Sequence, residues 1–307
     1  MTRYAVRPAT AADSAAIDTQ LSRQADRLEA LDRRVRMPRS AAPGGLVAVD
    51  AGAIAGHLRP LLVEITAGDE LLSFSFPSTV HWQEVVTADP VALAALAAAS
   101  RVHGAADAVL WPAVAGPAFG EVGLEPSFVF ALRPPGPLPC KTPVAVRRAW
   151  PADTESLVAL HEAEVAFHEP HTPYIRRVPG LEPAYRARLQ RAWAGADPVE
   201  GASVIHVAEI GGRVVAMCES MLQASPAGSA ASRLPAGRYG FLNSVSVAAA
   251  HRGAGIGRAV VAAAIANLAL YGVDGYTLWL ATGNPLARRV WPALGFRALW
   301  TRFERRP

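Results

Sequence analysis

The sequence predicts a mixed α/β fold that occurs twice along the chain, in tandem. First, residues 5–13 are matched by residues 145–153, at an offset of 140. Second, a proline-rich run at 134–142 separates the two copies, and its prolines exclude a helix or a central strand there. Third, 307 residues is the length of two domains of about 150 each. We therefore expect a first domain at 1–133, a linker at 134–142 and a second domain at 143–307.

The two copies begin and end alike. Each begins as a short strand, a turn and a helix, and the turns contain Asp13 and Asp153 where helix caps are expected. Near the ends, Trp111 parallels Trp279, so the offset has grown from 140 to 168. The first copy is therefore about thirty residues shorter than the second. We expect it to be a degenerate version of the same fold.

The second copy contains a clear series of strand and helix patterns. Ser203 to Ile210 and Arg213 to Gln223 are β-rich runs joined by two glycines, which predicts a hairpin. A polar stretch, a strand, a helix, a strand and a short helix follow at 224–237, 239–247, 256–271, 276–281 and 285–294. A hairpin followed by alternating strands and helices predicts a mixed β-sheet rather than a sandwich.

The composition excludes several classes of protein. With 51% hydrophobic and 18% charged residues, neither bulk disorder nor a collagen-like repeat is expected. No run reaches the roughly 20 apolar residues of a membrane span, and the N-terminus has no signal-peptide pattern, so we expect a cytoplasmic protein without a membrane partner. The net charge of +4 is spread along the chain without a basic helix face, so no nucleic-acid partner is expected. Two cysteines form no disulfide framework.

The most informative motif is a glycine-rich turn at 252–258, between a predicted strand and a predicted helix. Its three alternating glycines let backbone N–H groups converge beside the positive helix end, which suits a pyrophosphate. A nucleoside triphosphate loop needs a lysine there, and Lys141 is the only lysine. A dinucleotide fold needs a different glycine spacing and a later acid, which leaves coenzyme A.

The same residues carry a family resemblance. Arg252-Gly253-Ala254-Gly255-Ile256-Gly257 resembles the R/Q-x-x-G-x-G/A signature of the GNAT N-acetyltransferase superfamily. Asn284, Ala287, Trp291 and Gly295-Phe296 resemble the later N-x-x-A-x-x-x-Y/W-x-x-x-G-F segment of that family. The first copy has Asp89-Pro90 where the glycine turn would be. The chain thus resembles tandem GNAT proteins in which one copy has lost the motif.

The resemblance implies an acetyl-CoA-dependent N-acetyltransferase that acts on a small primary amine by direct transfer in a ternary complex. Acetyl-CoA is the implied co-substrate, and an amide of the Val245 strand would polarise its thioester carbonyl. The implied cofactor-binding residues come from that strand, the glycine turn and the second motif: Val245, Ser246, Val247, Arg252, Gly253, Ala254, Gly255, Ile256, Gly257, Arg258 and Asn284. Asn284 also suits a helix N-cap.

The general base is less well defined by sequence. Many family members have a glutamate where this chain has Asn243, which cannot accept the proton. Strand alternation places Glu219 on one face with Val215, Met217 and Met221, so we expect Glu219 to be the base in an apolar surround. His206 is a second candidate. Trp291 stands where the family often has a tyrosine acid, which leaves that role vacant or filled by water.

A segment rich in histidine and glutamate, 161–171, precedes Pro173-Tyr174 and is expected to form a loop at the acceptor site. Its histidine spacing matches no standard metal site, so no metal is expected. The alternative to an enzyme is a non-catalytic acyl-CoA-binding sensor or assembly module, since Asn243 and Trp291 replace family residues. The sequence identifies neither the acceptor nor the oligomeric state.

Overall fold

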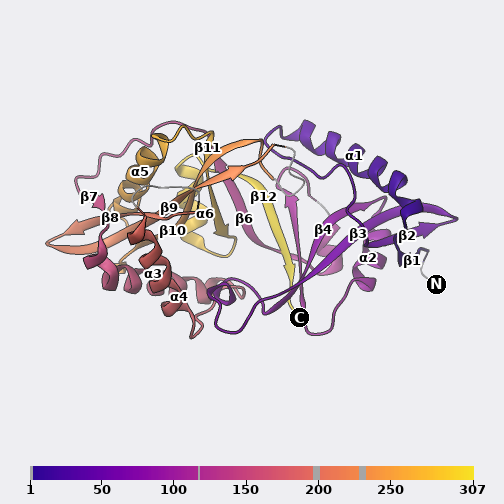
Figure 1. Ribbon diagram of the computed structural model, residues 1–307, viewed down its shortest axis with the longest axis horizontal. Helices are drawn as coiled ribbons and strands as arrows, with labels where there is room; N and C mark the ends of the chain where they lie inside the picture. The colour runs from indigo at the N-terminus through magenta and orange to yellow at the C-terminus, as the bar shows by residue number, and fades with distance from the viewer. Residues whose placement is uncertain (1–2, 117, 196–200, 228–232) are drawn as a thin grey trace.

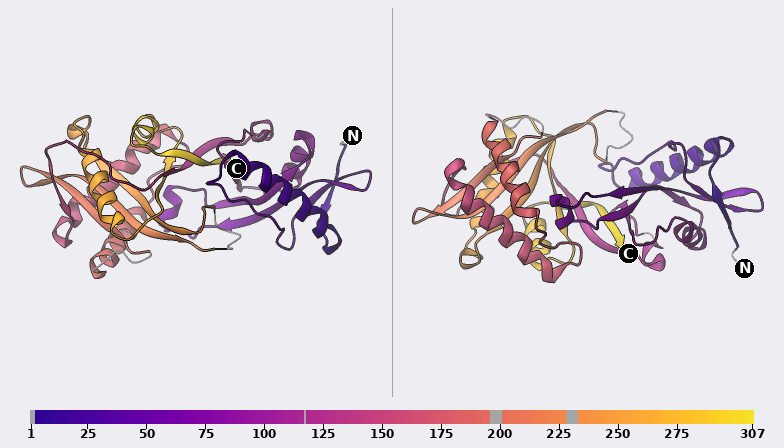
Figure 2. Two further views of the ribbon diagram at one scale, coloured as in Figure 1. Left: turned by 90° about the horizontal axis from the view of Figure 1, so that it is seen from above. Right: turned by 60° about the horizontal axis from the view of Figure 1, so that its bottom comes forward.

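The computed structural model describes residues 3–116, 118–195, 201–227 and 233–307. The molecule is elongated, with the first half of the chain at one end and most of the second half at the other (Figures 1 and 2). The C-terminus lies near the middle of the molecule (Figure 1). Among the described residues, no helix is long and apolar enough to cross a membrane.

The first half contributes six strands and two helices to the described structure. They are, in chain order, β1 (Ala5–Pro8), α1 (Ser14–Leu31), β2 (Leu46–Asp50), β3 (Ala53–Glu64), β4 (Ser78–Thr87), α2 (Pro90–Ala99), β5 (Ala106–Pro112) and β6 (Glu125–Arg133).

The second half repeats this order with two additional helices. Its elements are β7 (Ala145–Arg148), α3 (Thr154–His168), α4 (Leu181–Ala194), β8 (Val204–Ile210), β9 (Arg213–Ser225), β10 (Gly237–Val247), α5 (Ile256–Ala269), β11 (Gly275–Ala281), α6 (Pro285–Ala293) and β12 (Arg297–Arg305). The predicted hairpin, strands and helices are all present. The predicted polar stretch is shorter, because β9 extends to Ser225, and residues 228–232 of it lie outside the described residues.

An ion pair repeated in both halves confirms the internal repeat. Nη1 and Nη2 of Arg7 donate to the carboxylate of Asp13 at 2.7 and 2.8 Å. Arg147 donates to Asp153 in the same bidentate way at 2.7 and 2.9 Å. In each half the pair joins the first strand to the turn before the first helix, which fixes the entry angle of that helix.

All twelve strands form one sheet, in the order β1-β2-β3-β4-β5-β12-β6-β11-β10-β9-β8-β7. The last strand of each half is exchanged: β12 pairs with β5 of the first half, and β6 pairs with β11 of the second half. β6 and β12 also pair with each other, antiparallel, at the centre of the molecule (Figure 1). The two halves therefore share a continuous mixed sheet.

Helices cover both faces of the sheet in the second half. α5 packs on one face over an apolar core that includes Val260, Leu268 and Tyr276. α3 and α4 pack on the opposite face, around Leu157, Tyr185 and further apolar side chains. The proline-rich linker forms no helix or strand, and its carbonyls accept hydrogen bonds from Arg133 and Arg258.

Candidate active site

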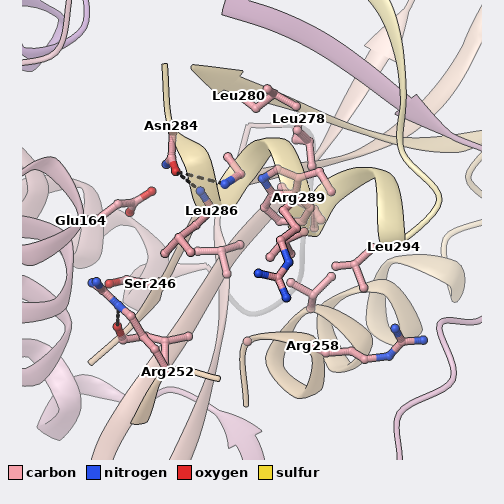
Figure 3. Close-up of a pocket in the computed structure, with 18 of the residues that line it drawn as sticks. Glu164, Ser246, Arg252, Arg258, Leu278, Leu280, Asn284, Leu286, Arg289 and Leu294 are labelled. Atoms are coloured by element: carbon pink, nitrogen blue, oxygen red, sulfur yellow. Dashed lines mark hydrogen bonds between the residues drawn. The ribbon is translucent and has the colours of Figure 1, made fainter. Parts of the chain in front are cut away.

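A pocket opens where two parallel strands separate. β10 and β11 pair only between Tyr239–Phe241 and Gly275–Thr277. Beyond this point, the residues of the two strands line a pocket of about 460 Å³, and Leu278 and Leu280 are among its lining residues (Figure 3). The predicted cofactor-binding residues all line this pocket except Ala254.

The glycine turn forms one end of the pocket. α5 begins at Ile256, and its N-cap Gly255 has φ 78° and ψ 2°, in the left-handed region that glycine adopts without strain. A Cβ at Gly255 would lie 2.5 Å from Oγ1 of Thr142, so a side chain there would also force the Thr142 side chain to move. Because Gly255 and Gly257 line the pocket, the unpaired N–H groups of the first turn of α5 lie at its wall.

Three arginines make this end of the pocket positive: Arg252, Arg258 and Arg289. Nε of Arg252 donates to the Val247 carbonyl at 3.0 Å, and its guanidinium stacks over the Phe167 ring at 4.6 Å. Nε of Arg258 donates to the Pro139 carbonyl at 2.7 Å. Within the described part of the chain, none of the three is paired with a carboxylate. Their positive charge is therefore free to meet an anion.

Asn284 caps α6 at the opposite wall. Its Oδ1 accepts hydrogen bonds from the backbone N–H groups of Leu286 and Ala287, each at 3.0 Å (Figure 3). Its Nδ2 lies 3.4 Å from a ring nitrogen of His168. The capping role expected for Asn284 is thus confirmed, and only Nδ2 is left to reach a ligand.

Glu164 lies on α3 and points into the pocket (Figure 3). Its carboxyl group hydrogen-bonds Ser244 Oγ, and Ser246 Oγ ties the same helix to β10 through the Leu160 carbonyl at 2.8 Å. The pKa of Glu164 is raised to about 7, chiefly because burial disfavours its charged form, and the nearby charge of Glu219 also raises it. Hydrogen bonds from Ser244 Oγ and from the Val245 amide act in the opposite direction and lower the pKa. The pocket thus holds a carboxyl group that titrates near neutrality.

The expectation of a loop at 161–171 is wrong, because α3 continues to His168 and a 3-10 turn follows at Glu169–His171. The helix places His161, Glu164 and His168 at spacings of three and four, on one face. That helical spacing was a sequence signal for Glu164. His161 is buried and stacked on Tyr185 at 4.0 Å between ring centroids, and burial lowers its pKa to about 3.

Glu219 is not among the residues that line the pocket, although it lies opposite Ser244 of β10 and its charge acts on Glu164. Its side chain is fully buried, and its carboxylate accepts hydrogen bonds from Arg188 Nε at 3.0 Å and from Ser203 Oγ at 2.7 Å. Arg188 also pairs with Glu70 of the first half, at 2.5 Å. The expected apolar surround is therefore wrong: the partner is an arginine of α4, an element that the sequence analysis did not predict.

The other predicted residues have varied positions. His206 is buried on β8, outside the pocket wall, and burial lowers its pKa to about 4. Asn243 and Trp291 line the pocket, and Trp291 packs edge-on against Phe296 at 5.4 Å. In the described ranges no group of three or more His, Cys, Asp or Glu side chains is placed to hold a metal ion.

In the first half, the helix end equivalent to the glycine turn is the start of α2, and a carboxylate occupies it. Asp89 caps α2: its Oδ1 accepts from the Ala92 amide at 2.9 Å, and its Oδ2 accepts from the Tyr4 hydroxyl. Arg3 lies 3.7 Å from the same carboxylate. In the second half, the start of α5 carries the glycine turn. In the first half, the equivalent start of α2 is occupied by the Asp89 carboxylate.

One pocket thus joins the N-terminus of α5, three arginines and a half-buried carboxyl group, beside the point where two strands of the mixed sheet separate. Residues 158–296 match the model of the acetyltransferase (GNAT) family. The matched residues lie in the second half of the chain and include most of α3, the glycine turn and Asn284, and the acyl donor of the family is acetyl-CoA.

Two solved structures are similar to this chain, and the first of them, with a TM-score above 0.5, has the same fold. A GCN5-related N-acetyltransferase from Sphaerobacter thermophilus is 15% identical over 100% of this chain and 97% of its own, with a TM-score of 0.54. Aminoglycoside N-acetyltransferase AAC(6')-Iy, in complex with CoA, is 15% identical over 52% of this chain and 92% of its own, with a TM-score of 0.39. A search of the curated proteins gave no match.

Proposed function

We propose that the chain transfers the acetyl group of acetyl-CoA directly to a small primary amine, in a ternary complex, at one active site in its second half. The observation that carries this proposal is the position of Glu164. One pocket joins a cationic end, suited to the phosphates of CoA, to a half-buried carboxyl group whose pKa is raised to about 7 by desolvation. An acetyltransferase for amines needs both features.

The pocket residues fit acetyl-CoA. The N–H groups at the start of α5 would hold the pyrophosphate, with Arg252, Arg258 and Arg289 nearby to neutralise phosphate charge. Val245 and Val247 would pair with the pantetheine arm, because β10 has no partner strand along this edge. When bound, acetyl-CoA supplies an acetyl thioester. Nδ2 of Asn284 is the remaining donor at the opposite wall.

Glu164 is proposed as the general base, in place of Glu219. An amine is protonated at neutral pH and must lose a proton before its nitrogen can bond to carbon. A carboxylate with a pKa near 7 accepts that proton while remaining ionised in about half of the molecules at pH 7. The backbone N–H of Val245 donates to Glu164. When acetyl-CoA binds, the thioester carbonyl oxygen would replace Glu164 as the acceptor of this hydrogen bond.

The first half is proposed to hold no acetyl-CoA. Asp89 already caps α2, so a pyrophosphate there would meet a fixed negative charge. The domain limits 1–133 and 143–307 remain a proposal about the origin of the two copies, because both copies share one sheet.

Two measurements test this function. Calorimetry with acetyl-CoA should give one site per chain, and a screen of amines should release CoA thiol faster than the background hydrolysis of acetyl-CoA. One binding site with no turnover of any amine would favour the acyl-CoA-binding module, which Asn243 and Trp291 also suit. No binding, or two equal sites, would contradict the proposal.

A further inference from the structure

Trp279 is an exposed aromatic side chain at the wall of the pocket. It lies on β11 between Leu278 and Leu280, which belong to or pack against the core under α5. Because side chains alternate along a strand, Trp279 points to the opposite face of the sheet. Its exposed fraction is 42%, a large value for tryptophan in a pocket wall. A flat apolar surface is thus open to a ligand in this pocket.

Trp279 is the open end of an aromatic row that crosses three strands. It lies opposite Phe130 of β6, and the two ring centroids are 5.0 Å apart at an interplanar angle of 43°. Phe130 in turn lies opposite Trp300 of β12. Phe130 and Trp300 are 8% and 0% exposed, so they support Trp279 and present little surface themselves.

The far end of the row is closed by the segment that precedes β10. Nε1 of Trp300 donates to the Arg233 carbonyl at 2.9 Å, and the guanidinium of Arg233 lies 5.4 Å from the centre of the Trp300 ring. Leu234 belongs to the same apolar cluster as Phe130 and Trp300. Because Trp300 and Phe130 are fixed, the Trp279 ring has a rigid back support, half of it contributed by the exchanged strand of the first half.

The charges of the pocket limit the acceptor to one ammonium group. Glu164 is the one carboxylate among the described residues that line the pocket, whereas Arg252, Arg258 and Arg289 are positive. With CoA bound, the arginines would face its phosphates, so an acceptor with several ammonium groups would have only Glu164 to pair with and would leave the other groups without a carboxylate in this pocket. The pocket therefore favours a monoamine.

We propose that the acceptor is a monoamine whose amino group is carried a short distance from a flat apolar ring, with the ring lying on Trp279 and the amino group at Glu164. This rests on the proposed function, since it names the substrate class of the same site. An offset or edge-on ring on Trp279 would gain both burial and aromatic contact.

The experiment compares three amines at saturating acetyl-CoA: 2-phenylethylamine, hexylamine and the polyamine spermidine. The chain should use 2-phenylethylamine with the highest kcat/KM. Trp279→Leu should lower that kcat/KM about tenfold to a hundredfold, the range of a lost apolar contact, and change the value for hexylamine much less. Trp150→Leu, which removes a more exposed tryptophan (54%) near the start of α3, should change neither.

The acceptor proposal would be overturned if kcat/KM were higher for hexylamine or spermidine than for 2-phenylethylamine. It would also be overturned if Trp279→Leu lowered kcat/KM equally for all amines. The proposed function would stand in both cases. If no amine is turned over, the proposed function fails. The ring site is then tested by calorimetric titration of 2-phenylethylamine into CoA-saturated protein. Binding that Trp279→Leu abolishes and Trp150→Leu retains would support the site, and absent binding would overturn it.

Discussion

Nε of Arg188 lies 3.0 Å from Oε1 of Glu219, in an ion pair that leaves the glutamate side chain fully buried. The same guanidinium reaches Glu70, so one arginine of α4 joins β9 to the first half of the chain. Removal of one partner from such a buried pair leaves an uncompensated charge, which destabilises the fold.

Glu219→Gln should therefore lower the free energy of unfolding by about 3 kcal/mol, since it removes one partner of a buried ion pair. The kcat of the folded variant should stay within a few-fold of wild type. Urea unfolding and steady-state kinetics check the two effects. Glu155→Gln is the matched control, because Glu155 pairs with Arg186 at the surface and should contribute less than about 1 kcal/mol. A large loss of kcat at unchanged stability would restore Glu219 as the base.

Glu164→Gln keeps the shape of the side chain and removes its basicity. It should lower kcat by about two to four orders of magnitude with little change in the affinity for acetyl-CoA. In wild type, kcat/KM should fall as pH drops below about 7, because protonation of Glu164 disables it. A wild-type profile that stays flat from pH 8 to pH 5.5 would show that another group removes the proton.

The raised pKa of Glu164 also makes a prediction about stability. Its pKa in the fold is about 7, above the ordinary value of 4.5, so the folded chain binds this proton more tightly than the unfolded chain. The stabilisation is complete below pH 4.5 and is lost as pH rises through 7, by about 3 kcal/mol. Urea unfolding at pH 5.5 and pH 8.5 should therefore show Glu164→Gln gaining stability relative to wild type at the higher pH. The same difference in unfolding free energy between Glu164→Gln and wild type at pH 5.5 and at pH 8.5 would contradict this prediction.

The sequence predicted the fold class, the repeat and the glycine turn at the start of α5 because these depend on patterns of neighbouring residues. Alternation, glycine spacing and capping act within a few residues, so 239–247 and 256–271 were located to within three residues at each end. The exchange of β6 and β12 was not predictable, because the alternation of side chains within a strand does not determine which distant strand it pairs with. Glu219 was assigned without knowledge of Arg188, which the fold brings to it from 31 residues away.

Gly255→Val should weaken the binding of acetyl-CoA by about a hundredfold or more. The new side chain would meet Thr142 and narrow the turn where backbone N–H groups must approach a phosphate. Gly272→Val is the matched control: Gly272 follows α5, has φ 64° and has open space around its Cβ position. Both variants should lose about 1 to 2 kcal/mol of stability from left-handed backbone strain. Only Gly255→Val should change the dissociation constant measured by calorimetry; an equal change in both variants would assign the effect to strain.

Because the two halves exchange strands, we expect the second half to need the first half in order to fold. β6 lies between β11 and β12 and pairs with both, from Tyr276 opposite Arg133 to Glu304 opposite Glu125. A fragment of residues 143–307 would lack β6 and leave two long strand edges unpaired, which favours aggregation. We expect this fragment to be insoluble or oligomeric when expressed alone, and to form a soluble one-to-one complex that binds acetyl-CoA when expressed together with residues 1–142. Size-exclusion chromatography with light scattering, followed by calorimetry, measures both properties. A monomeric 143–307 fragment that binds acetyl-CoA as tightly as the full chain would show that the second half folds independently, and that the exchange seen at β6 and β12 contributes little to the site.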